Sequence, residues 1–246
     1  MEDFLAYEIR ESVLMTEGID GYFGLSPSFR NATLSLPDQL YEAGVISENK
    51  FTIWINNNAD DSKSASMIFG GMPEGATRGE SYSLSINTAK SQWWTVSYKG
   101  LLYGSDSIYG SNIKYAIIDS GTTFINLGNQ DFLNFKQKIQ GAPGGDLWNC
   151  PDNNACFSNE TDCATFAPNM EPLEIILGNI HTIIPPEGYL ISNPVPDINE
   201  PLCTAAVYKV RDTEKIVLGD AFMRNFVVTF DNENNAIQLG INSVSV

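Results

Sequence analysis

Hydrophobic and polar positions along the chain fall mainly into short runs bounded by Gly, Asn, Asp or Pro, which is typical of β-strands. Such runs are found at 51–55, 65–71, 81–87, 93–105, 115–119, 174–185, 205–210, 214–218 and 224–242. We expect 93–105 to form a strand, a turn and a second strand. We expect 174–185 to be hairpin-like around Gly178-Asn179, and 224–242 to be a hairpin across Asp231–Asn235. The pattern predicts a mainly β fold.

Two segments have the pattern of helices instead. Residues 34–46 place Pro37 near a first turn and Gly44 at a stop, which favours a short helix. Residues 129–139 carry apolar side chains at helical spacing behind Asn129, which we expect to cap an amphipathic helix.

Size and charge limit the classes of function. The chain has 246 residues, 43% of them hydrophobic, so it can bury the core of one large β domain or of two smaller units. A formal net charge of -16 disfavours nucleic acid and anionic membrane surfaces as partners. No stretch is long and apolar enough to span a bilayer, and residues 1–13 lack the apolar centre of a signal peptide. The acidic surface suits work in acid, and ordinary solubility explains it equally well.

Cysteine and histidine usage narrows the chemistry further. The four cysteines, at 150, 156, 163 and 203, allow three pairings, among which spacing does not choose. They form no zinc motif, no nucleotide-binding motif is present, and we expect neither a metal nor a cofactor. The single histidine, His181, lies in a strand-like segment and is expected to be a packed or surface residue. Mechanisms that need a Ser–His or Cys–His pair therefore have little support, and carboxylate chemistry remains.

Two sequons begin at Asn31 and Asn159. They matter only in a secreted chain, where they would be glycosylation sites. Together with the even number of cysteines they favour an oxidising, secretory compartment.

The segment AIIDSGTTFINL, residues 116–127, delivers Asp119 from an apolar strand into Ser120, Gly121, Thr122 and Thr123. Gly121 permits a turn that a Cβ atom would obstruct. The Thr122 hydroxyl can donate back to the Asp119 carboxylate and favour its charged form. A second, facing carboxylate would share a proton with Asp119 and activate a water molecule. From the residues alone, a carboxylate that merely caps a turn is an equally good interpretation.

The whole chain resembles the pepsin-like aspartic proteases. The resemblance covers nearly the full length in six segments that follow the family's order: IDGYFGLSPS, PDQLYEAGVISENKFTIWI, MIFGGMP, WWTVSYKGL, AIIDSGTTFINL and KIVLGDAFMRNFVVTFDNENNAIQLG. Each segment is weak to moderate by itself, and six in order are specific. The aspartic dyad of this family is the established example of two carboxylates that share a proton.

The resemblance implies roles for individual residues. Asp119 is one of the two catalytic aspartates, and Thr122 supports its carboxylate. Ser120 helps to tie two lobes together, while Gly121 and Thr123 contact the substrate. Residues further along the chain have structural roles: Gly219 closes a glycine loop that braces the active-site strand, Cys163 and Cys203 form a disulfide, and Cys150 and Cys156 are left as a local pair.

The resemblance also has a gap. The chain contains no second D-T-G or D-S-G motif and no counterpart of the family's flap tyrosine. We therefore expect residues 1–73 to be the end of an N-terminal lobe and residues 74–246 to be a C-terminal lobe with the second active-site motif. The implied function is an aspartic endopeptidase that hydrolyses peptide bonds in acid, in a secretory, extracellular or lysosome-like space. The chain by itself would lack the rest of the N-terminal lobe, and we expect it to be inactive. The alternatives are a non-catalytic peptide-binding protein of the same fold, or a dimer that pairs two copies of Asp119.

Overall fold

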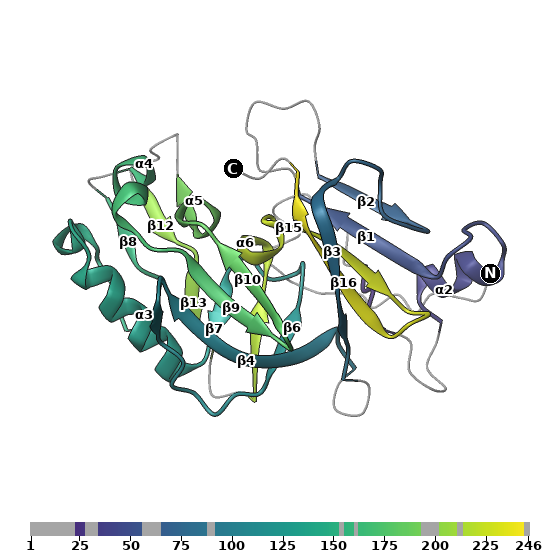
Figure 1. Cartoon of the computed structure of the whole chain (residues 1–246), viewed down its shortest axis with the longest axis horizontal. Coiled ribbons are helices and arrows are strands. Elements are labelled where there is room, and N and C mark those ends of the chain that lie inside the picture. The colour runs from purple at the N-terminus through teal and green to yellow at the C-terminus, as the bar shows by residue number, and fades with distance from the viewer. Residues whose placement is uncertain are drawn as a thin grey trace, which may run out of the picture.

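The structure is a computed structural model, and it describes residues 23–27, 34–55, 65–87, 92–152, 155–159, 162–192, 202–210 and 214–243. Within these ranges the chain is mainly β, as the hydrophobic pattern predicts (Figure 1). The described helices are short, apart from one that flanks the largest sheet. In these ranges, no helix is both long and apolar enough to cross a membrane.

Three sheets make up the fold. The five-stranded sheet has the order β2-β1-β15-β16-β3, and the eight-stranded sheet has the order β10-β9-β4-β6-β14-β7-β13 with β5 paired to β4. A small sheet has the order β11-β12-β8. The strands of the five-stranded sheet are β1 (Lys50–Trp54), β2 (Ser66–Phe69), β3 (Thr77–Ser85), β15 (Phe226–Asp231) and β16 (Ala236–Asn242). Those of the eight-stranded sheet are β4 (Thr95–Tyr103), β5 (Asp106–Ser107), β6 (Tyr115–Ile118), β7 (Ile125–Leu127), β9 (Leu173–Leu177), β10 (Ile180–Ile184), β13 (Val207–Lys209) and β14 (Lys215–Leu218). Those of the small sheet are β8 (Phe157–Ser158), β11 (Leu190–Ser192) and β12 (Cys203–Ala205).

The helical elements are α2 (Leu36–Glu42), α3 (Asn129–Gly141), α4 (Cys163–Phe166), α5 (Pro186–Tyr189), α6 (Asp220–Met223), and the 3₁₀ turns η1 (Gly145–Leu147) and η2 (Ala167–Asn169). Both helices expected from the sequence are therefore present, and so are the hairpins β9–β10 and β15–β16. One expectation is wrong: residues 95–103 form a single strand without a turn. The strand continues because its register shifts between Tyr98 and Gly100, where the missing Cβ leaves room for the Ile176 side chain.

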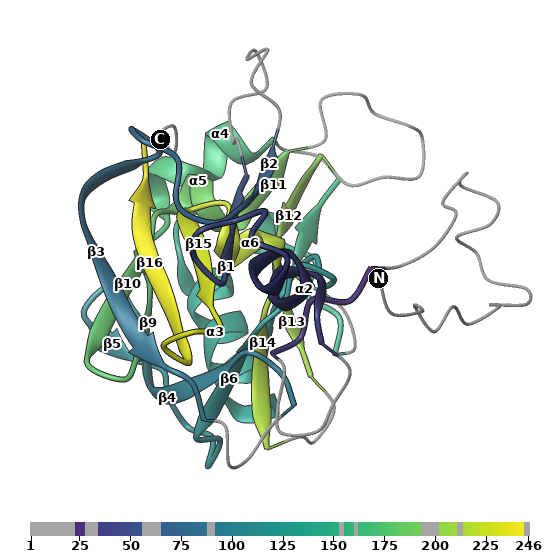
Figure 2. The same ribbon diagram turned by 90° about the vertical axis from the view of Figure 1, so that its right-hand side faces the viewer.

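The five-stranded sheet joins distant parts of the sequence (Figure 2). Strand β1 pairs antiparallel with β15, and the two central threonines, Thr52 and Thr229, are opposite each other. Their hydroxyls form a buried hydrogen bond of 2.7 Å. The stack of Phe51 on Phe230, with ring centroids 4.7 Å apart, adds an aromatic cross-strand contact.

Helix α3 covers one face of the eight-stranded sheet (Figure 1). Its apolar stripe, Phe132, Phe135 and Ile139, is fully buried, as the helical spacing predicts. Burial of each side chain of this size contributes roughly 1.5–3 kcal/mol. The expected cap is wrong: Gly128 is the N-cap residue, Asn129 is the first helical residue, and no side chain caps this end.

A crossing in the eight-stranded sheet positions the candidate site. Strands β6 and β7 are consecutive in the chain, yet β14 lies between them, parallel to β6 and antiparallel to β7. The turn from β6 to β7 must therefore pass over the end of β14. Asp119 is the first residue of that turn.

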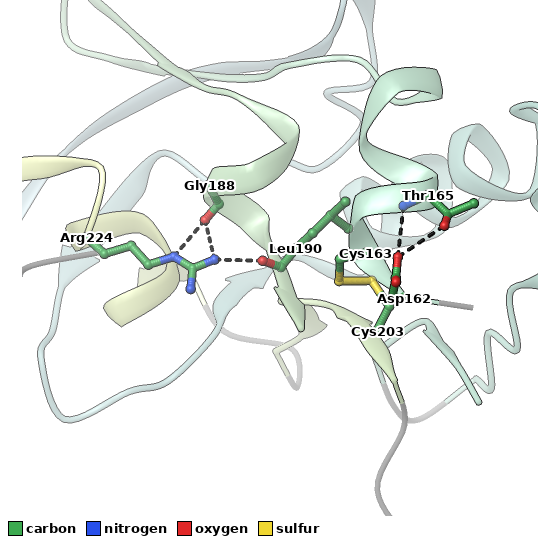
Figure 3. The surroundings of a disulfide bond; sticks show 7 residues. All are labelled: Asp162, Cys163, Thr165, Gly188, Leu190, Cys203 and Arg224. Carbon is green, nitrogen blue, oxygen red and sulfur yellow. Dashed lines mark hydrogen bonds between the residues drawn. A yellow bond between two sulfur atoms is a disulfide. The ribbon is translucent and has the colours of Figure 1, made fainter. Parts of the chain in front are cut away.

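Two disulfides, Cys150–Cys156 and Cys163–Cys203, use all the cysteines and are the pairs that the resemblance implies. The second bond joins α4 to β12 across a sequence separation of 40 residues (Figure 3). A cross-link that closes a loop of this length contributes about 4 kcal/mol on chain-entropy grounds. Asp162 caps α4 beside the bond, and its carboxylate accepts from the Thr165 backbone N–H at 3.0 Å.

Candidate active site

The turn after β6 holds the Asp119 carboxylate with donors from its own residues. The Gly121 backbone N–H donates to Oδ1 at 2.9 Å, and the Thr122 hydroxyl donates to Oδ2 at 2.7 Å. The hydrogen bond expected from Thr122 is thus present. The side chain of Asp119 is half-buried, so the carboxylate is fixed on one side and accessible on another.

The two glycines of the site, Gly121 and Gly219, lie where an added Cβ atom would come very close to neighbouring atoms. A Cβ atom on Gly219 would lie 2.1 Å from the Thr122 carbonyl oxygen, so no side chain fits there. A Cβ atom on Gly121 would lie 3.1 Å from Asp119 Oδ1, and Gly121 is not among the described glycines with positive φ. The structure therefore gives a different reason for Gly121 than the sequence does: space beside the carboxylate, and not the conformation of the turn.

The beginning of α6 locks this turn in place. The Asp220 N–H donates to the Thr122 carbonyl at 2.8 Å, and the Ala221 N–H donates to the Thr123 carbonyl at 3.0 Å. The Gly219 N–H donates to the Phe124 carbonyl at 3.2 Å. Backbone groups from two distant segments therefore satisfy each other, and the turn that carries Asp119 becomes rigid.

Asp220 is a second carboxyl group in the electrostatic field of the site, and sequence reasoning gave it no role. Burial, and after it the negative charge of Asp119, raises the pKa of Asp220, while the Arg224 guanidinium acts in the opposite direction. Asp220 belongs to the segment KIVLGDAFMRNF, so its place beside the glycine loop was visible. Its proximity to Asp119 depends on the strand crossing, which the sequence does not show.

Arg224 connects the site to the disulfide region (Figure 3). Its guanidinium donates to the Gly188 carbonyl from Nε at 2.9 Å and from Nη2 at 2.7 Å, and to the Leu190 carbonyl at 3.1 Å. Leu190 begins β11, which pairs with the disulfide-linked β12. The helix that braces Asp119 is thereby tied to the most strongly cross-linked part of the fold.

Other residues singled out from the sequence lie in different places. Ser120 and Thr123 are exposed in the Asp119 turn, with no side-chain role visible in the hydrogen bonds. His181 is exposed on β10 and paired with Glu174, away from the turn, in agreement with a surface residue. Asn159 is exposed just after β8, and Asn31 lies outside the described residues.

The five aspartates that precede β3 in the sequence have other roles or lie outside the described residues. Asp38 accepts from the Ser35 N–H at 2.9 Å and so caps α2. Asp3, Asp20, Asp60 and Asp61 lie outside the described ranges. Where the chain is described, no group of three or more His, Cys, Asp or Glu side chains is arranged to hold a metal ion.

Comparison with known proteins gives a consistent result. The family model described as eukaryotic aspartyl protease matches residues 4–241. The chain belongs to this family. Pepsin II-2/3 of Oryctolagus cuniculus is 24% identical over 236 residues, covering 90% of the chain and 53% of the relative. Gastricsin of Callithrix jacchus is 25% identical over 230 residues, covering 89% of the chain and 53% of the relative.

Membership of the aspartyl protease family agrees with the mainly β fold and with the two disulfides. Pepsin A of Suncus murinus, 21% identical over 234 residues, matches 93% of the chain and 55% of its own length. The chain spans about half the length of the curated relatives that it matches.

Proposed function

We propose that the chain supplies one catalytic aspartate, Asp119, to an aspartic endopeptidase that hydrolyses peptide bonds in acid. The observation that carries the proposal is the half-exposed Asp119 carboxylate, held by Gly121 and Thr122 on a turn that α6 locks in place. A family match over residues 4–241 supports the reaction type.

In this proposal Asp119 and a facing aspartate share one proton and activate a water molecule for attack on the peptide carbonyl. Thr122 keeps the Asp119 carboxylate oriented. Gly121 and Thr123 contact the peptide backbone or side chains, and Ser120 contributes its hydroxyl behind the dyad. Gly219 is structural, because any side chain there would displace the turn.

We further propose that the facing aspartate comes from an N-terminal lobe, since the matched relatives are about twice as long as the matched region. Residues 74–246 would then be the C-terminal lobe, and residues 1–73 the end of the N-terminal lobe. The chain by itself would have little or no activity. A dimer that pairs two Asp119 residues, or a peptide-binding protein without catalysis, are the alternatives.

A secretory, extracellular or lysosome-like location fits the two disulfides, which form and persist in oxidising compartments. Asn159, which is exposed, and Asn31 each begin a sequon, and we propose both as glycosylation candidates.

The test begins with the native transcript, read in frame upstream of Met1. We expect it to encode a second D-T-G or D-S-G strand, and the full product to cleave protein at acid pH. Asp119→Asn should lower that cleavage by about 10²–10⁴-fold, and the 246-residue chain should be inactive when expressed by itself. Cleavage by the chain that disappears on dilution, with a native mass of twice the chain, would establish the dimer instead. A full product that binds peptides but cleaves none would favour the binding protein.

A further inference from the structure

Two sheets of the fold end next to each other and leave a groove between them. Strand β10 is the last strand at one end of the eight-stranded sheet, and β3 is the last strand at one end of the five-stranded sheet. Figure 1 shows β10 at the border of its sheet that is nearest to β3 and β16. The groove measures about 360 Å³, within the size range of ligand sites, and its lining includes Arg78, Tyr82, His181, Ile183 and Ile241.

The walls of this groove are mainly apolar. Tyr82, Ile183 and Ile241 are 49%, 57% and 47% exposed, and deeper in the groove they give way to the buried side chains of Phe226 and Leu239. Single exposed apolar residues are ordinary, whereas apolar side chains that gather around one groove indicate a binding surface.

The edge of β10 presents backbone hydrogen-bonding groups to the same groove. The two-residue turn Gly178-Asn179 joins β9 to β10, so Leu177 and Ile180 close the hairpin as a hydrogen-bonded pair. Because bonded and non-bonded pairs alternate, the N–H and C=O groups of His181 and Ile183 point away from β9. In the described part of the chain these backbone groups have no hydrogen-bond partner outside the hairpin. An extended peptide can therefore pair with β10 as an added strand.

This edge lacks the usual protection against pairing. Exposed strand edges are commonly blunted by charged residues or by proline. Strand β3 carries Arg78 and Glu80, whereas β10 has the sequence IHTII, with no lysine, arginine or proline. The open edge of β10 is therefore available for an added strand.

The charge of the groove differs from that of the whole chain. Among the described residues that line it none carries a carboxylate, although the chain has 30 Asp and Glu residues against 14 Lys and Arg. The lining has the guanidinium of Arg78 and the imidazole of His181, which is paired with Glu174. Arg78 has an interaction of its own within the chain, so what it offers to a ligand is the attraction of a positive charge. Charge complementarity thus favours an acidic occupant.

We propose that this groove binds an extended segment of a separate polypeptide, in which apolar and acidic side chains alternate and whose backbone pairs with β10. Successive side chains of an extended segment point to opposite sides. The apolar ones pack on Tyr82, Ile183 and Ile241, and the acidic ones lie in the field of Arg78. A polypeptide is favoured over a small apolar acid, because only a main chain matches the alternating donors and acceptors of a strand edge. The groove does not include Asp119, and the proposal is independent of the proposed function.

The experiment measures peptide binding to the 246-residue chain by fluorescence polarisation at pH 7 and 0.15 M salt, where charges are screened beyond about 8 Å. The probe is a capped, labelled peptide in which Val and Glu alternate, and its counterpart alternates Val and Lys. In spite of the net charge of -16, we expect the glutamate peptide to bind about tenfold more tightly than the lysine peptide. The N-methylated form of the glutamate peptide should bind about tenfold more weakly, because it cannot donate to the edge of β10.

Two variants locate the binding on the chain. Tyr82→Ser removes an exposed apolar wall and should weaken binding about tenfold, whereas Tyr41→Ser, on α2 and outside the lining, is the matched control and should leave it unchanged. Ile183→Pro removes an outward N–H that the hairpin does not use, and it should weaken binding by a similar factor. Urea unfolding of each variant checks that the fold is retained, and the N-methylated peptide tests the same hydrogen bonds without altering the chain.

Several results would overturn the proposal. These are no measurable binding, equal binding of the glutamate and lysine peptides, undiminished binding of the N-methylated peptide, or binding that Tyr82→Ser leaves unchanged. If the chain binds the peptide and the full product of the native transcript does not, a segment of the same protein fills the groove, and the separate polypeptide is excluded. The role of Asp119 is decided by the cleavage assay of Asp119→Asn, so the two proposals can fail separately.

Discussion

Asp119 lies in the turn after β6 and Asp131 in the first turn of helix α3, and the surroundings of the two carboxylates are opposite. Asp119 is half-buried and accepts from Gly121 and Thr122, both in its own turn. Asp131 is fully buried in α3 and accepts at 2.6–2.8 Å from the N–H of Gly110 and from the N–H and hydroxyl of Ser111. The Tyr98 hydroxyl donates a fourth hydrogen bond to Asp131 at 3.0 Å.

The comparison shows what distinguishes a structural carboxylate from one available for chemistry. The Asp131 carboxylate accepts four hydrogen bonds from β4 and from the 108–111 loop, and it thereby links both segments to α3. Because the group is also fully buried, it has no room for a ligand. The donors of Asp119 occupy one side only. Four predictions test this difference, beginning with the largest effect.

Asp119→Asn is expected to lower the acid peptidase activity of the full product by about 10²–10⁴-fold, because the amide cannot take up the shared proton. Its stability should stay within about 1 kcal/mol of the wild type, since the asparagine Oδ1 still accepts from the Gly121 N–H and its Nδ2 can donate to the Thr122 hydroxyl oxygen. Measurements of kcat/KM and of urea unfolding on the same preparation would test both parts. Undiminished activity would remove Asp119 from the mechanism.

Asp131→Ala is expected to have the opposite profile. It leaves two backbone N–H groups and two hydroxyls without their acceptor inside the protein, so we expect a loss of about 3–5 kcal/mol in the free energy of unfolding. Urea denaturation of the chain measures this value. The control is Asp162→Ala, which removes the exposed cap of α4 and should cost about 1 kcal/mol. Equal losses in the two variants would contradict a special role for the buried network.

Two matched deletions of a single hydroxyl sharpen the comparison. Tyr98→Phe and Thr122→Val each remove one donor to an aspartate, Asp131 in the first case and Asp119 in the second. Tyr98→Phe should cost about 1–2 kcal/mol of stability and leave kcat/KM nearly unchanged. Thr122→Val should cost less stability and lower kcat/KM about tenfold, because the carboxylate loses its orientation. A reversed pattern would show that the two carboxylates had been assigned the wrong way round.

The difference between the two sites also explains what the sequence could predict. Asp119 and its donors lie within four consecutive residues, so the pattern DSGT was sufficient to suggest the hydrogen bond from Thr122. Asp131 depends on donors about 20 residues away, and the sequence analysis predicted a cap at Asn129 for this helix and gave Asp131 no role. Local chemistry is visible in a sequence, whereas contacts made by the tertiary fold are not.

Strand boundaries show the same limit. The runs at 115–119 and 224–242 match β6, β15 and β16 closely, because each is apolar, short and ended by polar or glycine residues. The run at 93–105 was divided wrongly, because Gly100 reads as a turn residue in sequence. In the structure it is a point of close packing against Ile176 within one continuous strand. The position of Asp220 beside Asp119 likewise depends on β14 lying between β6 and β7, which no sequence pattern showed.

The smallest expected effect concerns Asp220, and it depends on pH. Burial and the charge of Asp119 raise the pKa of Asp220 above its ordinary value of 3.8, so the folded state holds this proton more tightly than the unfolded state. The stabilising contribution of the protonated group is therefore fully present below about pH 3.8 and is lost as the pH rises through the elevated pKa.

Asp220→Asn remains neutral throughout and avoids that loss. The variant should gain stability relative to the wild type between acid and neutral pH, and unfolding by urea at pH 3 and pH 7 would measure the change. Glu80→Gln, an exposed substitution on β3, is the matched control. If the difference between Asp220→Asn and the wild type is the same at both pH values, folding does not raise the pKa of Asp220, and the prediction is wrong.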